Sequence, residues 1–125
     1  MKLLLDTHVL LWWLGDDMRL RAEARNAIAE PENIVFVSAA TTWEIAIKTS
    51  LGKLTLPEGL EDQISKNAFT PLPITIAHTL AIAQLPPIHQ DPFDRMLVSQ
   101  ALLEDMTLIT HDQRIMKYDV EILTA

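Results

Sequence analysis

The sequence contains no cysteine, which excludes disulfide bonds and thiolate-bound metals. A chain without disulfides is compatible with the reducing cytoplasm, where we expect this protein to act. Long hydrophobic runs are also missing, because no apolar stretch reaches the roughly 18 residues of a membrane span. An acid follows the three leucines near the N-terminus, so this stretch is too short for a signal peptide. We therefore expect no membrane association.

Basic residues are scarce relative to acidic ones. The chain has 10 Lys and Arg against 17 Asp and Glu, a formal charge of −7. Proteins that bind nucleic acid through its phosphates are usually basic, so the charge alone argues against such a partner. This argument weakens if several carboxylates surround divalent cations, because the metal then supplies the local positive charge.

The 125 residues correspond to one domain, residues 1–125, without repeats, low-complexity tracts or a linker. Short apolar runs predict strands at residues 2–5, 33–37, 107–110 and 120–123. Helical patterns cover residues 7–14, 19–30, 38–52, 58–68, 75–85 and 92–105. This alternation predicts an α/β fold, with a central, mainly parallel sheet of four to five strands and helices on both faces.

Two aspartates follow predicted strands. Asp6 comes directly after the strand at 2–5, and Asp112 lies two residues past the strand at 107–110. If these strands are neighbours, both carboxylates face one crevice at the carboxyl edge of the sheet. The alternative is that each aspartate only caps the helix after it, since Asp is a favoured N-cap.

Glu44 borders the apolar stripe of the predicted helix that begins at Ser38. A carboxylate in that position needs a partner. Two structural explanations stay open, a capping box with Thr41 and an i,i+4 ion pair with Lys48. Ser38 is the better N-cap candidate and would leave Thr41 inside the helix, which favours a role for Glu44 in a site.

The stretch HQDPFDRMLVSQA, residues 89–101, places two aspartates at the start of a predicted helix. Asp91 is a natural N-cap, with Pro92 at the first helical position. Asp94 falls at the third position, where a capping box prefers the longer Glu or Gln. We therefore interpret Asp91 as the residue that starts the helix and Asp94 as the residue that serves a site.

Carboxylates that converge from separate segments, without His or Cys, favour a hard cation with oxygen ligands, such as Mg²⁺ or Mn²⁺. Sites of this kind activate water and stabilise a phosphate during in-line displacement. The acid pattern is therefore what a metal-dependent nuclease requires.

Four segments, LLLDTHVLLWWL, SAATTWEIAIKTSLGKL, DPFDRMLVSQA and LITHDQRI, follow in order along nearly the whole chain. Through them the chain resembles PIN-domain ribonucleases, and more closely the VapC-type toxins of bacterial toxin–antitoxin pairs. The resemblance implies a PIN fold and a Mg²⁺- or Mn²⁺-dependent endoribonuclease that cleaves RNA. It also implies a cognate antitoxin that occupies the site and a homodimer.

The resemblance further implies which side chains form the site. By position, the catalytic residues are Asp6, Glu44, Asp94 and Asp112. The three aspartates among them are expected to hold the metal. Thr7 and Thr110 flank the pocket and are expected to hold ligands or water by hydrogen bonds. Asp91 belongs to the surrounding motif, as a cap or as an outer-shell ligand.

Further candidates lie beside these acids. His111 adjoins Asp112 and is a candidate for substrate contact. Lys48 and Arg95 are placed either to meet RNA phosphates or to form ion pairs with the neighbouring acids. His8 is interpreted as a helix-start residue.

Four aromatic or imidazole side chains are given structural interpretations. His78 and His89 are interpreted as ordinary surface or loop residues. Of Trp12 and Trp13, one is expected to pack in the core, and the other is available for a nucleobase or a partner surface. A solvated helix face that adds a basic rim is predicted for Arg19, Arg21 and Arg25.

Two other protein classes share the length and acidity of this chain. A phosphoreceiver domain needs an acceptor Asp after a middle strand, where this chain has Ser-Ala-Ala after residues 33–37. A dehalogenase-type phosphatase needs Asp-x-Asp after the first strand, where Asp6 is followed by Thr7 and His8. A non-catalytic interaction module derived from a PIN domain is the remaining alternative, and the complete acid set argues against it.

Overall fold

The computed structural model describes residues 1–125 and contains one sheet of five strands. The strands are β1 (Lys2–Leu5), β2 (Ile34–Ser38), β3 (Thr70–Leu72), β4 (Thr107–Thr110) and β5 (Ile122–Thr124). Their order across the sheet is β3-β2-β1-β4-β5, and every neighbouring pair is parallel. The predicted α/β class is therefore confirmed, and the sheet is parallel throughout.

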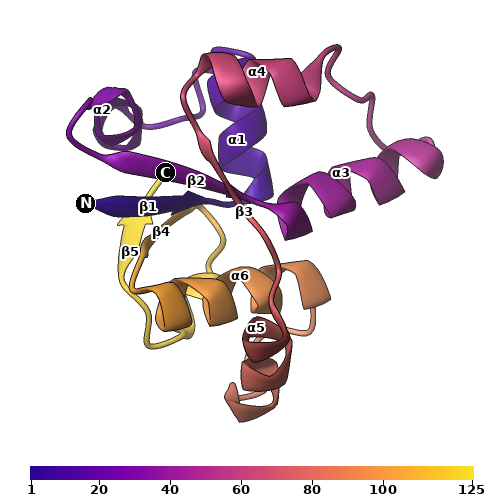
Figure 1. The fold of residues 1–125 in the computed structure, drawn as a ribbon, viewed down its shortest axis with the longest axis vertical. Coiled ribbons are helices and arrows are strands. Elements are labelled where there is room, and N and C mark those ends of the chain that lie inside the picture. Colours follow the sequence, from indigo (N-terminus) through magenta and orange to yellow (C-terminus); the bar gives the residue numbers. More distant parts are fainter.

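Six α-helices lie on the two sides of this sheet (Figure 1). They are α1 (Thr7–Leu14), α2 (Ala22–Ala29), α3 (Ala39–Ser50), α4 (Leu60–Lys66), α5 (Ile76–Ala81) and α6 (Pro92–Glu104). Two short 3-10 turns, η1 (Ile82–Gln84) and η2 (Ile115–Lys117), follow α5 and β4. No helix is both long enough and apolar enough to cross a membrane.

The central strand β1 contributes to two hydrophobic cores. Leu3 and Leu5 pack with apolar residues of α1, α2 and α4 on one face of the sheet. Leu4 faces the other side and packs with α6 and the segment around η2. All three leucines are fully buried, which explains why the strand is an unbroken apolar run and does not alternate with polar residues.

The predicted boundaries agree with the structure for β1, α1 and β4 and differ elsewhere. Helix α2 begins at Ala22 and not at residue 19, because the Asp17 carboxylate accepts the backbone N–H of Arg19 and holds a turn there. The helix predicted at 75–85 becomes α5 followed by η1. Strand β5 lies two residues later at its start than predicted.

The strand order decides where the site forms. Because β1 lies between β2 and β4, the segments that follow these three strands emerge side by side at the carboxyl edge of the sheet. Asp6 follows β1, helix α3 follows β2, and Asp112 comes shortly after β4. Asp6 and Asp112 were expected to share one crevice if the strands before them are neighbours. Those strands, β1 and β4, pair directly.

Candidate active site

A cavity of about 520 Å³ opens at the carboxyl edge of the sheet. Its lining is polar apart from Trp12, and Asp91 belongs to it. It also contains all four acids that the sequence assigns to the site, namely Asp6, Glu44, Asp94 and Asp112. The structure thus brings together carboxylates from the ends of β1 and β4 and from helices α3 and α6.

Asp6 is both a helix cap and a member of the cavity. Its Oδ1 accepts the backbone N–H of Val9 at 2.8 Å, which caps α1. Its Oδ2 accepts a short hydrogen bond from the hydroxyl of Thr110, at the end of β4. The residue is only 5% exposed, and this burial raises the pKa of its carboxyl above the ordinary value despite the two hydrogen bonds. The two interpretations of Asp6 are therefore compatible.

Thr110 links Asp6 to Asp112. Its hydroxyl oxygen also accepts the backbone N–H of Asp112 at 3.0 Å. The Asp112 carboxylate in turn accepts the backbone N–H groups of Arg114 and Ile115 through Oδ1. Burial would raise the pKa of Asp112, but these two backbone bonds and the nearby His89 lower it below the ordinary value. Oδ2 of Asp112 stays available to the cavity.

Glu44 is buried on α3 and has a partner for each oxygen. Oε1 accepts the hydroxyl of Thr7 at 2.6 Å, and Oε2 lies 2.6 Å from Nζ of Lys48. The hydrogen bond with Glu44 raises the pKa of Lys48. The predicted i,i+4 ion pair is therefore present, and Thr7 supports an acid as the resemblance implied.

The alternative capping box on α3 is absent. Ser38 is the N-cap, and its hydroxyl accepts the backbone N–H of Ala40 at 2.9 Å. Thr41 lies inside the helix, and its buried hydroxyl has no partner. Glu44 is thus free of the helix terminus and faces the cavity.

Asp91 and Asp94 divide as the sequence suggested. Asp91 is the N-cap of α6, where its Oδ1 accepts the backbone N–H groups of Phe93 and Asp94. Asp94 projects from the first turn of that helix and makes no such local bond. Burial, followed by repulsion from Asp91, Asp112 and the other acids, raises the pKa of Asp94 to about 8. The electrostatic surroundings of Asp94 are therefore set mainly by other acids.

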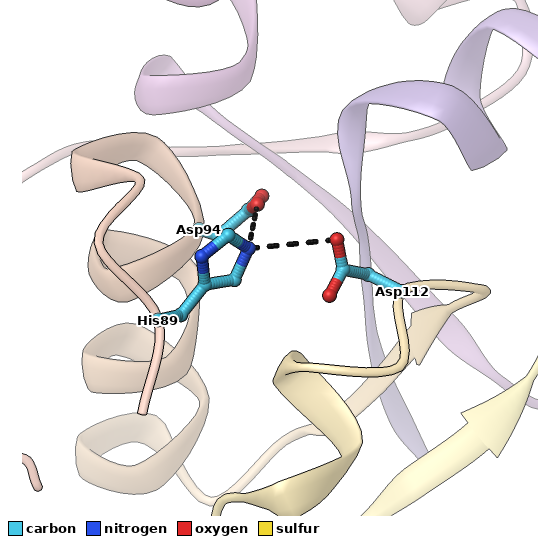
Figure 2. A group of neighbouring side chains, drawn as sticks. All are labelled: His89, Asp94 and Asp112. Carbon is cyan, nitrogen blue, oxygen red and sulfur yellow. Dashed lines mark ion pairs between the residues drawn. The ribbon is translucent and has the colours of Figure 1, made fainter. Parts of the chain in front are cut away.

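Two histidines differ from the prediction that they are ordinary surface or loop residues. His78 is buried in α5, and His89 lies in a loop but is buried there. His78 takes part in the cap of α5 and contacts Glu104 at 3.0 Å, away from the cavity. His89 lies in the cavity, with Nε2 2.9 Å from Oδ2 of Asp94 and 3.5 Å from Oδ2 of Asp112 (Figure 2). One feature of the sequence could have indicated this position, namely that His89 lies two residues before the N-cap of a helix that carries a site acid.

Arg95 does not line the cavity and forms no ion pair with Asp94, so that alternative is wrong, while contact of Arg95 with RNA stays a prediction. Its guanidinium donates to the backbone carbonyls of Ile82, Pro86 and His89 and to the hydroxyl of Tyr118. The charge is thereby used to hold the segment between η1 and α6. The position of Arg95 next to Asp94 in the sequence could not indicate these partners.

Aromatic and basic side chains form one rim of the cavity. Trp12 lies between the rings of His8 and His111, with centroid separations of 6.2 and 5.9 Å. The guanidinium of Arg19 lies 5.3 Å from the centroid of Trp12 and also binds Asp17. Arg19 precedes the start of α2, so the prediction that it belongs to a helix face is wrong. Of the three arginines predicted to form a basic rim, Arg19 lines the cavity.

Trp13 has a different environment from Trp12. It packs against Phe69, and its indole N–H donates to Asn67 at 2.9 Å. Of the two tryptophans, Trp13 is thus used in packing between elements, and Trp12 is the one that faces the cavity.

The residues of the cavity suit a divalent cation. The nearest potential ligand atoms of His89, Asp94 and Asp112 all lie within 4.8 Å of one another. Carboxylate oxygens predominate, which favours hard cations such as Mg²⁺ or Mn²⁺. Repulsion from the neighbouring acids contributes to the raised pKa of Asp94, and a bound cation would relieve it.

The fold and the site place the chain among α/β proteins that carry an acidic cavity at the carboxyl edge of a parallel sheet. The family model of the PIN domain matches residues 3–121, and the chain belongs to that family. Membership also removes the phosphoreceiver alternative.

Among characterised proteins, the chain is similar to ribonuclease VapC22 of Mycobacterium tuberculosis. The two are 29% identical over 119 residues, which cover 90% of this chain and 88% of VapC22. It is also 38% identical over 61 residues to ribonuclease VapC16 of the same organism, covering 46% of this chain and 43% of VapC16.

Solved structures show the same fold. VapBC2 from Rickettsia felis, bound to a DNA fragment from its promoter, matches with a TM-score of 0.74 and 14% identity over 99% of this chain and 98% of that chain. VapBC-1 from nontypeable Haemophilus influenzae matches with a TM-score of 0.67 and 20% identity over the same shares.

Proposed function

We propose that this protein is an endoribonuclease that uses Mg²⁺ or Mn²⁺, and that it is the toxin of a toxin–antitoxin pair. The observation that carries the proposal is the convergence of Asp6, Glu44, Asp94 and Asp112 from four separate elements in one cavity. Two relatives named as ribonucleases of the VapC type support it. The fold shared with VapBC structures is consistent with it.

In this mechanism Asp6, Asp94 and Asp112 would hold the cation, directly or through water. When bound, Mg²⁺ or Mn²⁺ lowers the pKa of a coordinated water and stabilises charge on the scissile phosphate. Thr110 fixes Asp6 and the backbone of Asp112, so both carboxylates keep their direction. Glu44, which accepts a hydrogen bond from Thr7, is the fourth acid of the site and orients the attacking water.

Binding of RNA by an acidic protein needs local cations at the cavity. Arg19, which follows α1, and Lys48, on α3, both line it. Each is paired with an acid, Arg19 with Asp17 and Lys48 with Glu44, but the side chain of Arg19 is 70% exposed and can also meet a phosphate. His111 is exposed beside Trp12 and belongs to the same substrate rim.

The partner of the proposed toxin is a cognate antitoxin. Several solved structures with this fold are VapBC complexes, and two of them are described as bound to DNA. We expect the antitoxin to cover the cavity and block access of RNA. A homodimer and a cytoplasmic location stay predictions.

The test is RNA cleavage by the purified protein with Mg²⁺, with Mn²⁺ and with EDTA, compared with the variant Asp6→Asn. Asn is also a good N-cap, so this variant keeps α1 capped while it removes the negative charge. We expect cleavage in the presence of either metal, none with EDTA, and a loss of at least about 100-fold in Asp6→Asn.

A matched control is Asp119→Asn, which removes an exposed acid outside the cavity. It should cleave RNA at the wild-type rate. A folded Asp6→Asn protein that cleaves like the wild type would refute the assignment. A wild type that binds RNA but never cuts it would favour the non-catalytic module instead.

A further inference from the structure

His89 is immobilised at its backbone and on one side of its ring. Its backbone N–H donates to the hydroxyl of Tyr118 at 2.9 Å, and its carbonyl accepts from Nη1 of Arg95 at 3.3 Å. The residue is 7% exposed. A side chain fixed in this way has one orientation relative to the acids of the cavity.

The hydrogen bond at Nδ1 determines which ring nitrogen carries the proton. The backbone N–H of Asp91, which can only donate, lies 3.3 Å from Nδ1 of His89. Nδ1 therefore accepts, and a neutral imidazole in this setting carries its proton on Nε2. The chain thus presents an N–H group to the interior of the cavity.

Nε2 lies close to two carboxylates and forms a hydrogen bond with neither. Nε2 lies 2.9 Å from Asp94 and 3.5 Å from Asp112, yet it has no acceptor in hydrogen-bond direction. Figure 2 shows the nitrogen with one carboxylate on each side. Asp94 comes from α6 and Asp112 from the loop after β4, so the ring is a contact shared by two elements.

We propose that His89 is a positioning residue for the cation site, because its Nε2–H draws the Asp94 and Asp112 carboxylates toward one point. The proposal rests on the proposed function, since it concerns the same site. Two carboxylates so close repel each other unless positive charge or a donor lies between them. A donor held there keeps both oxygens converged before a cation arrives, and such outer contacts typically change metal affinity by about 10- to 100-fold.

Direct ligation by His89 is a different arrangement with a different signature. Ligation through Nε2 would require the ring to give up the proton of the tautomer that the Asp91 amide favours, because the lone pair of Nδ1 faces that amide. The positioning role therefore predicts a cation that has oxygen neighbours only.

The experiment measures Mn²⁺ binding by calorimetry and by electron paramagnetic resonance, without RNA. In His89→Asn the amide is too short to place a donor at Nε2, whereas in His89→Gln the amide N–H reaches that position. We expect Mn²⁺ affinity to fall about 10-fold or more in His89→Asn and to recover largely in His89→Gln.

The matched control is His78→Gln, because His78 is also buried and also contacts a carboxylate, but lies outside the cavity. It should bind Mn²⁺ as the wild type does. Nitrogen NMR of the metal-free protein should show the proton of His89 on Nε2. Both measurements are independent of nuclease activity.

Three results would overturn the proposal. They are a His89→Asn protein with wild-type affinity, a proton found on Nδ1, and a directly bound nitrogen in pulsed resonance spectra of the Mn²⁺ complex that His89→Gln removes. Each of these leaves the nuclease assignment intact. A wild type that binds no Mn²⁺ would overturn the proposed metal dependence and this role together.

Discussion

Threonine hydroxyls contact the two most buried carboxylates of the site. Thr110 donates to Asp6, and Thr7 donates to Glu44. A hydroxyl adds no charge, so it fixes the direction of a carboxylate without neutralising it. At the scale of single residues, the two threonines therefore restrict the positions of these oxygens without adding charge to the site.

The first prediction concerns Thr110→Val, which keeps the shape of the side chain and removes the hydroxyl. One oxygen of Asp6 and the amide of Asp112 then lose their partner in a buried place. We expect the free energy of unfolding to drop by about 1–3 kcal/mol, and RNA cleavage to fall by roughly 10-fold or more.

Urea unfolding and initial cleavage rates measure these two effects. Thr110→Ser is the control, because it retains the hydroxyl and should keep cleavage close to the wild-type rate. Equal cleavage by the Val and Ser variants would show that the hydroxyl does not support the site.

The second prediction uses the pKa of Asp94, which rises from an ordinary 3.8 to about 8 in the folded protein. Between these values the folded protein holds a proton that the unfolded chain has lost, so stability falls as pH rises. The contribution is complete below about 4 and is lost as pH passes about 8. Asp94→Asn lacks this group and should gain stability over the wild type as pH rises.

Thermal unfolding in EDTA between pH 4 and pH 8 measures this difference. We expect an advantage of roughly 5 °C or more for Asp94→Asn at the alkaline end, shrinking toward pH 4. For Asp112→Asn the sign is opposite. The lowered pKa of Asp112 stabilises the folded protein at pH values above the ordinary pKa of an aspartate, so this variant should be less stable than the wild type there. A pH-independent difference for Asp94→Asn would contradict the assigned shift.

At the scale of elements, the start of α6 both initiates the helix and contributes residues to the site. Asp91 caps the helix and thereby sets the direction from which Asp94 projects. The preceding segment is held by Arg95 and carries His89 into the cavity. One short stretch of chain therefore supplies a cap, a site acid and the histidine that lies between two acids.

The third prediction separates the cap from the charge of Asp91. Asp91→Ser keeps an N-cap and should retain stability, whereas Asp91→Ala should lose about 1 kcal/mol. We expect cleavage by Asp91→Ser to stay within roughly threefold of the wild type, because the cap is what positions Asp94.

Chemical unfolding and cleavage assays on both variants measure this. A stable Asp91→Ser protein that has lost cleavage would assign the carboxylate of Asp91 to the chemistry itself. The same loss in Asp91→Ala alone would not distinguish the two roles.

Local patterns in the sequence predicted most elements and the acids of the site. Asp6 and Asp112 were recognisable because each follows an apolar run, and a parallel sheet aligns the ends of its strands. The partners of Arg95 and the burial of His89 were not predictable, because both depend on how the segment between α5 and α6 folds back. The hydrophobic periodicity of a sequence does not indicate how such a loop folds, so it could not place a single charged or aromatic side chain within it.

At the scale of the whole molecule, a net charge of −7 includes a concentration of acids at one edge of the sheet. The fourth prediction is that Mg²⁺ or Mn²⁺ raises the melting temperature of the wild type, in proportion to the logarithm of the metal concentration above its dissociation constant. Binding to the folded state alone produces this dependence, and it also relieves repulsion among the carboxylates.

Differential scanning calorimetry across a metal titration measures the effect, and EDTA should reverse it. Asp94→Asn should show a much smaller increase than the wild type. An equal increase in both proteins would mean that the cation binds elsewhere on this acidic surface.

The pairing of β1 with β4 has a consequence for the nascent chain during translation. Thr110 and Asp6 are 104 positions apart in the chain, yet they share a hydrogen bond. A ribosome making this polypeptide at about 5–20 residues per second releases Asp6, Glu44 and Asp94 before the strand that completes their pocket. Translation products that stop before β4 therefore carry most of the acids but lack the strand that completes the cavity, so the site is assembled only near the end of synthesis.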